Sequence, residues 1–104
     1  MMNRQELMNR IKSALQAAHG ERLKAVVLFG SEARNTATPE SDIDILVVMR
    51  DMVRTQDDLA NLDALYPLIL ESERPIDAIS VAETDFEAAL FPLYQNAKKE
   101  GIFL

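Results

Sequence analysis

The sequence contains no cysteine, no long apolar run and few basic residues, and each of these absences excludes a class of protein or site. Without cysteine there is neither a disulfide framework nor a metal site built from thiolates. No apolar segment approaches the ~20 residues that a membrane-spanning helix needs. The segment Met1 to Glu6 also lacks the apolar stretch of a signal peptide. We therefore expect a cytoplasmic protein that does not contact a membrane.

The charge balance restricts the partners. There are 17 acidic residues against 11 basic ones, which gives a formal net charge of -6. Proteins that bind nucleic acids draw most of their non-specific affinity from lysine and arginine side chains that face phosphates. Direct binding of DNA or RNA is therefore not expected, whereas an acidic surface favours a basic protein partner.

Apolar periodicity predicts alternating helices and strands in one domain over residues 1–104. The predicted helices are 3–19, 31–34, 55–73 and 84–100, and the predicted strands are 23–29, 43–49 and 76–81. A capping box at 84–87 should start the last helix, while Pro67 and Pro92 should kink or break the helices that contain them. Three alternatives stay open for the apolar tail 102–104: it could form a short edge strand, pack on the core or contact a partner. The order α-β-α-β-α-β-α predicts an α/β domain.

Two aspartates stand at the centre of the chain, near the start of a strand. The apolar runs 25–29 and 43–49 both read as buried strands, and Asp42 and Asp44 flank a single isoleucine at the head of the second. Because strand side chains alternate between faces, the two carboxylates project from one face. Such a pair is repulsive unless a cation lies between its members, and Mg²⁺ prefers carboxylate and phosphate oxygens.

The residues that follow the first strand have the properties of a phosphate site. Gly30 allows a sharp turn and a close approach of the backbone to a ligand. The predicted helix 31–34 would present its first N–H groups to an anion, and the Ser31 hydroxyl adds another donor. Together with the paired carboxylates, these residues indicate a site for a metal-bound triphosphate at one end of the sheet.

The pattern Gly-Ser, ten residues, Asp-x-Asp resembles the signature of the polymerase-beta-type nucleotidyltransferases. The longer string G-S-E-A-R…S-D-I-D-I-L-V-V resembles the minimal nucleotidyltransferases (MNT family), several of which are antitoxins of HEPN-domain toxins. The resemblance implies the nucleotidyltransferase fold, with a small mixed sheet instead of the parallel sheet that alternation alone would suggest. One departure is Asn35, where the family often has glycine; asparagine adopts left-handed backbone conformations better than other residues with a side chain.

The resemblance also implies the roles of individual residues. Three carboxylates, Asp42, Asp44 and Asp77, would be catalytic and would hold two Mg²⁺ ions. The implied nucleotide-binding residues are those of the turn and the carboxylate pair: Gly30, Ser31, Arg34, Asp42 and Asp44. For Arg34 two roles are equally favoured: it could contact phosphate, or it could hold the loop through an internal ion pair.

The implied reaction transfers AMP from ATP to a hydroxyl and releases pyrophosphate. For an MNT antitoxin the acceptor would be a tyrosine of the cognate HEPN toxin. The chain is too short to build a second wall around the nucleotide, so a homodimer or a hetero-oligomer with the toxin is expected to complete the site. Two alternatives stay open: an antitoxin that neutralises by binding alone, and a subunit that modifies the hydroxyl of a small molecule.

Several charged residues have less specific interpretations. Asp77 could simply pair with Arg74, and His19, as the only histidine, is expected to cap a helix end or face solvent. Glu32 and Glu40 are expected to face solvent.

Overall fold

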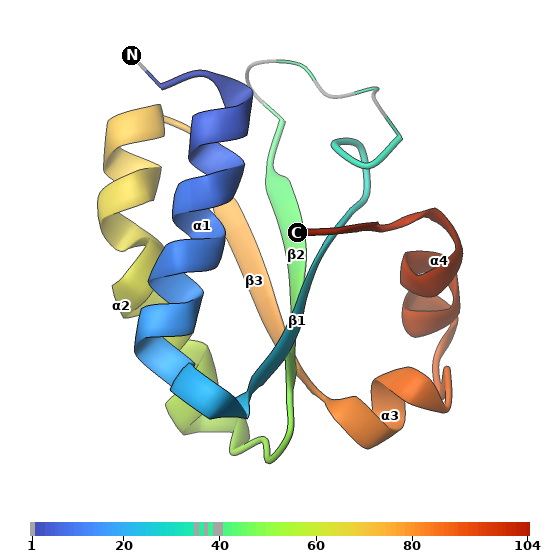
Figure 1. Cartoon of the computed structure of the whole chain (residues 1–104). Coiled ribbons are helices and arrows are strands. Elements are labelled where there is room, and N and C mark those ends of the chain that lie inside the picture. Colours follow the sequence, from blue (N-terminus) through green and yellow to red (C-terminus); the bar gives the residue numbers. More distant parts are fainter. Residues whose placement is uncertain (1, 35, 37, 39–40) are drawn as a thin grey trace.

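The computed structural model describes residues 2–34, 36, 38 and 41–104. A β-sheet separates two layers of helices, with α1 and α2 on one face and α3 and α4 on the other (Figure 1). The strands are β1 (Leu23–Phe29), β2 (Ile43–Met49), β3 (Ile76–Ala82) and β4 (Ile102–Phe103). The helices are α1 (Arg4–His19), α2 (Arg54–Ser72), α3 (Glu83–Glu87) and α4 (Pro92–Glu100), with a 3-10 turn η1 (Gly20–Arg22).

The sheet is mixed, as the family resemblance implied. Its order is β3-β2-β1-β4, and β1 runs antiparallel to both β2 and β4. β2 and β3 are parallel, because the long helix α2 connects them as a crossover. β4 confirms the edge-strand alternative for the tail and pairs with β1 through Val27 and Leu28.

Alternation along the strands divides the core into two layers. On β2, Ile43, Ile45 and Val47 pack with α1 and α2, whereas Leu46 and Val48 pack with α3 and α4. The side of α3 and α4 is completed by Val27, Val81, Phe86, Tyr94 and Ala97. By the same alternation, the side chain at position 44 belongs to the face of α3 and α4, near the end of the sheet where β2 begins.

Two predicted helices differ in the structure. Residues 31–34 form a hydrogen-bonded turn, closed by the Arg34 N–H donating to the Gly30 carbonyl, because a single turn gains too few hydrogen bonds to continue as a helix. The predicted helix 84–100 is divided into α3 and α4, and Pro92 is the first residue of α4, where its missing N–H is not needed. The capping box is also wrong, since α3 begins at Glu83 after an Ala82 cap that has no side-chain hydrogen bond.

Other termini agree with the sequence. Gly20 ends α1 with a positive φ of 60°, and Gly101 ends α4 after the basic residues Lys98 and Lys99. Pro67 lies inside α2 without breaking it, since Leu65 and Leu68 on either side are both buried in the core.

The prediction for His19 is wrong. Its ring is buried and its Nε2 lies 2.6 Å from Oδ1 of Asn61, on α2. Asn61 in turn donates from Nδ2 to Oγ of Ser80, on β3, at 2.7 Å. This buried chain of polar groups connects α1, α2 and the sheet, so His19 has a structural position far from the predicted site.

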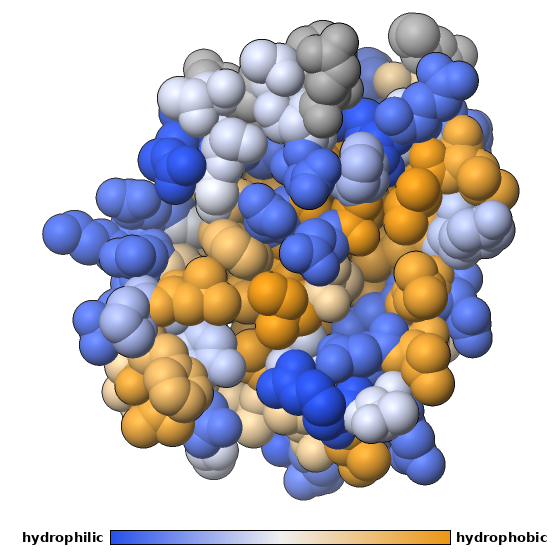
Figure 2. Space-filling view, turned by 180° about the vertical axis from the view of Figure 1, so that it is seen from behind, coloured by the Kyte–Doolittle hydropathy of each residue, from blue (hydrophilic) through white to orange (hydrophobic). Residues whose placement is uncertain are grey.

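The surface retains large apolar side chains. Figure 2, which views the molecule from behind, shows apolar patches between polar ones. Leu59, Leu62, Tyr66 and Leu70 lie at helical spacing along α2 and are all more than half exposed. None of the helices in the described residues is both long and apolar enough to cross a membrane.

Candidate active site

Three strands bring the predicted acidic residues to one end of the sheet. In the strand register, Asp44 on β2 lies opposite Phe29 on β1 and opposite Asp77 on β3. Paired residues of neighbouring parallel strands project from the same face about 4.8 Å apart. Asp42 stands one residue before β2 and is exposed, as is Asp77, whereas Asp44 is half-buried. The structure therefore places Asp44 at the centre of an acidic row.

The carboxylates of Asp77 and Asp42 are close enough to Asp44 for their charges to affect it. Burial raises the pKa of Asp44 above its ordinary value, and the negative charges of Asp77 and Asp42 raise it further. The positive charge of Arg34 opposes this shift. The row is thus an arrangement of incompletely compensated negative charge, and a cation would reduce the repulsion within it.

The donor set suits a hard divalent cation, since all three groups are carboxylates. As the side chains lie, no group of three His, Cys, Asp or Glu residues in the described part of the chain could hold a metal ion. Metal binding by all three carboxylates would therefore require these side chains to move closer together.

Gly30 brings the backbone directly against the central carboxylate. Its φ is 70°, in the left-handed region that residues with a side chain disfavour. A Cβ at this position would lie only 2.7 Å from Oδ2 of Asp44. The conformation thus favours glycine here, and any added side chain would displace the Asp44 carboxylate. The half-buried Ser31 follows immediately in the turn.

A pocket of about 230 Å³ opens between this turn and α4. It is lined by Phe29, Gly30, Ala33, Arg34, Leu93, Asn96, Ala97 and Glu100. Its size is below the ~300 Å³ at which ligand pockets usually begin, so it would hold part of a nucleotide or of an acceptor. Another pocket, of about 280 Å³, lies between α1 and β4, and the three aspartates line neither of the two; the first adjoins the row through Gly30 and Arg34.

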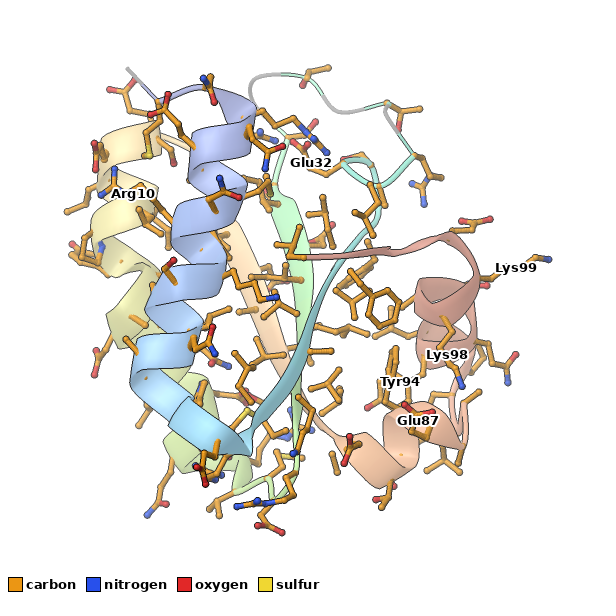
Figure 3. All side chains as sticks on the ribbon, viewed as in Figure 1. Arg10, Glu32, Glu87, Tyr94, Lys98 and Lys99 are labelled. Atoms are coloured by element: carbon orange, nitrogen blue, oxygen red, sulfur yellow. The ribbon has the colours of Figure 1, made fainter. Side chains whose placement is uncertain are left out.

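Glu32 does not face solvent as predicted. It is 5% exposed and lies between the N-terminal end of α1 and the start of β2 (Figure 3). Its carboxylate forms ion pairs with Arg74 and with Arg4. Arg74 therefore pairs with Glu32 and with the Ser41 carbonyl, and the described residues include no ion pair between Arg74 and Asp77. Glu40 and Asn35 lie outside the described residues.

Comparison with known proteins assigns this geometry to a family. A profile of the nucleotidyltransferase domain matches residues 8–104. The chain belongs to the nucleotidyltransferase domain family. A protein of Methanocaldococcus jannaschii, provisionally named a protein adenylyltransferase, is 33% identical over 104 residues, which covers 96% of each chain. The polymerase-beta-type resemblance drawn from the sequence is thereby confirmed.

Solved structures show the same fold. A toxin–antitoxin complex with AMP-PNP matches the nucleotidyltransferase with a TM-score of 0.67 and 23% identity, over 91% of this chain and 69% of the other. A complex of the tri-AMPylated HEPN toxin of Shewanella oneidensis with its MNT antitoxin matches with a TM-score of 0.65 and 21% identity, over 95% and 69% of the two chains. At these identities the likeness concerns the fold.

The nucleotidyltransferase thus gathers most of the residues that the sequence singled out. Gly30, Arg34, Asp44 and Asp77 are brought together by strand register, the close approach at Gly30 and the electrostatic coupling to Asp44. Glu32 and Arg74 were missed, because a glutamate and an arginine 42 positions apart in the sequence gave no local signal of their pairing.

Proposed function

We propose that the chain is a magnesium-dependent protein adenylyltransferase and an antitoxin, which transfers AMP from ATP to a tyrosine hydroxyl of a cognate HEPN-domain toxin. The observation that carries this proposal is the register of Asp44 and Asp77 beside Gly30, since it sets carboxylates against a backbone turn suited to phosphates. The names of the relatives support the acceptor class, because they include a protein adenylyltransferase and an MNT antitoxin bound to an AMPylated toxin.

In this proposal the residues divide the work between phosphate binding and metal binding. Gly30 and Ser31 offer backbone N–H groups and a hydroxyl to the triphosphate, and Arg34 adds a positive charge. Asp42, Asp44 and Asp77 hold the divalent ions, which would neutralise charge on the phosphates and on the attacking oxygen.

The bond changes are those of a nucleotidyl transfer. The acceptor oxygen forms a bond to the α-phosphorus of ATP, the bond from that phosphorus to the bridging oxygen of pyrophosphate breaks, and pyrophosphate leaves. Asp77, an exposed member of the row, accepts the proton of the acceptor hydroxyl. The exposure of Asp42 and Asp77 supports an acceptor that is itself a protein, because a partner surface can cover the open side of the row.

The test is intact-mass spectrometry of the proposed HEPN-domain partner after incubation with the chain, ATP and Mg²⁺. The expected result is a gain of whole adenylyl units, mapped to tyrosine by peptide sequencing. The matched control is the Asp42→Asn/Asp44→Asn chain, which keeps the shape of both side chains and should give no gain. A stable complex that silences the toxin without any gain in mass would replace the transferase with an antitoxin that acts by binding.

A further inference from the structure

A buried ion pair lies directly behind the carboxylate row. Glu32 belongs to the turn that begins at Gly30, and only 4% of its side chain is exposed. A buried carboxylate is costly unless its charge and its hydrogen bonds are matched. Here one oxygen, Oε1, accepts from Arg74, and the other, Oε2, accepts from Nε of Arg4 at 3.1 Å.

Arg74 joins this turn to the segment that carries Asp42. Its Nη2 and Nε donate to the carbonyl of Ser41 at 2.9 and 3.3 Å, while Nη2 also contacts Glu32. Ser41 is the residue immediately before Asp42. A planar guanidinium suits such a role, because its donors diverge in a fixed geometry toward two acceptors.

The same arginine also lies next to the start of β3. Arg74 stands three residues before Asp77, and the carbonyl of the intervening Pro75 accepts a hydrogen bond from the N–H of Ile43 at 2.9 Å. One buried pair therefore links three separate segments: the turn with Ser31, the residue before Asp42 and the strand with Asp77.

We propose that Glu32 and Arg74 are positioning residues of the active site, which set the distance between the phosphate-binding turn and the carboxylates. This inference rests on the proposed function for what the site binds. Its physical basis is that a buried ion pair adds little net stability over apolar side chains of similar volume, but holds its partners in one geometry. A displacement of about 1 Å of a reacting group is enough to reduce a rate by about 10²-fold.

Arg4 provides a matched control. It contacts the same carboxylate, but half of its side chain is exposed, and within the described residues it forms no hydrogen bond or ion pair with the segments that carry the aspartates. The Arg4 end of this ion pair is open to solvent, and a glutamine in its place keeps an N–H donor for Oε2 of Glu32. Arg4→Gln should therefore leave both nucleotide binding and transfer close to those of the native chain.

The experiment compares Glu32→Met/Arg74→Met and Arg74→Lys with Arg4→Gln and the native chain. Three quantities are measured: the thermal midpoint, the Kd for Mg²⁺–AMP-PNP by calorimetry, and kcat for adenylyl transfer. The double variant removes both charges together and should keep a thermal midpoint near the native value. It should bind the analogue about 10-fold more weakly and transfer about 10²-fold more slowly. Arg74→Lys keeps the positive charge but not the forked donor geometry of the guanidinium. It should keep the native thermal midpoint and lower kcat.

The outcomes separate a positioning role from a structural one. The inference would be overturned if kcat fell only as far as the fraction of folded protein fell, with an unchanged Kd. A native kcat in Arg74→Lys would also overturn it. If the double variant does not fold, Arg74→Lys and Arg4→Gln still decide. A native chain that binds the analogue but modifies no HEPN protein would reject the proposed acceptor alone, because the Kd comparison stands without it.

Discussion

Replacing Gly30 with alanine would displace the central carboxylate without replacing any side chain of the site. The added Cβ would lie 2.7 Å from Oδ2 of Asp44, closer than such atoms are found in proteins. The carboxylate is the mobile partner, since it ends a rotatable side chain. To reach an ordinary contact of 3.4 Å it must retreat by about 0.7 Å. Displacements near 1 Å reduce rates by about 10²-fold, so a loss of this order is expected in transfer.

Stability should change as well, for a reason unrelated to the site. A residue with a side chain in the left-handed region costs roughly 1–2 kcal/mol, part of which is offset by a stiffer unfolded chain. For a domain of this size a net loss of about 1 kcal/mol lowers the Tm by about 4–8 °C. Gly20 supplies the control for this effect, since its φ of 60° is also positive and a Cβ there would meet nothing within 4 Å.

Gly20 ends α1, before the start of β1, whereas Gly30 follows the end of β1. Its ψ of -134° makes its conformation at least as dependent on glycine, so Gly20→Ala should be destabilised no less than Gly30→Ala. Thermal unfolding by circular dichroism and initial rates of adenylyl transfer would be measured on both variants well below their Tm. Equal rate losses in the two variants would refute the reasoning, because only Gly30 touches the carboxylate.

Three further changes test the charged and polar groups. Burial and neighbouring negative charges raise the pKa of Asp44, so its charged form is less favourable in the folded chain than in the unfolded one. Asp44→Asn should therefore raise the Tm at pH 7 without Mg²⁺ by a few degrees, with the gain shrinking as the pH is lowered. Burial alone would raise the pKa of Asp57, but hydrogen bonds and the charge of Arg22 outweigh it and the pKa lies below the ordinary value. The contribution of the Arg22–Asp57 pair to the free energy of unfolding is fully present above about pH 4 and is lost as the pH falls through the lowered pKa. Urea titrations of Asp57→Asn should therefore show a free energy of unfolding that decreases less steeply in acid than that of the native chain. Asn61→Leu leaves the buried His19 ring without its partner and should cost about 2–4 kcal/mol in the same titrations; a loss below 0.5 kcal/mol would contradict a structural role for this chain of groups.

Local pattern was sufficient for the strands and the long helices. The continuous apolar runs at 23–29 and 43–49 agree with β1 and β2, and the apolar spacing in 3–19 agrees with α1 to within one residue. The sequence pattern predicted the wrong local structure where a segment satisfies its backbone hydrogen bonds in another way. Residues 31–34 close a turn, and Pro92 begins a helix instead of kinking one, because the chain reverses between α3 and α4 with Ala89 at a φ of 50°.

The site was predictable to the extent that its parts lie within a motif. Asp42, Asp44 and Gly30 are fixed by spacing, and Asp77 by its place at the start of a strand that must lie parallel to β2. The buried polar groups were not predictable. Glu32 pairs with Arg74 and His19 with Asn61, and in each case the partners are 42 residues apart, so their burial depends on the tertiary fold and not on local sequence.

Charge at this end of the sheet is handled in two opposite ways. The charge of Glu32 is buried and paired with two arginines, whereas Asp44 lies among other carboxylates, with the charge of Arg34 opposing their effect. Positive side chains thus neutralise Glu32, whose contacts hold the backbone in place, but leave the charge at Asp44 for a bound cation to neutralise. A ligand that binds only the folded state stabilises it by mass action, so Mg²⁺ with a nucleotide should raise the Tm, and should raise it further as the ligand concentration increases above the Kd. Asp44→Asn should be more stable than the native chain without ligand and less responsive to it, since the repulsion that destabilises the row is also what attracts the cation.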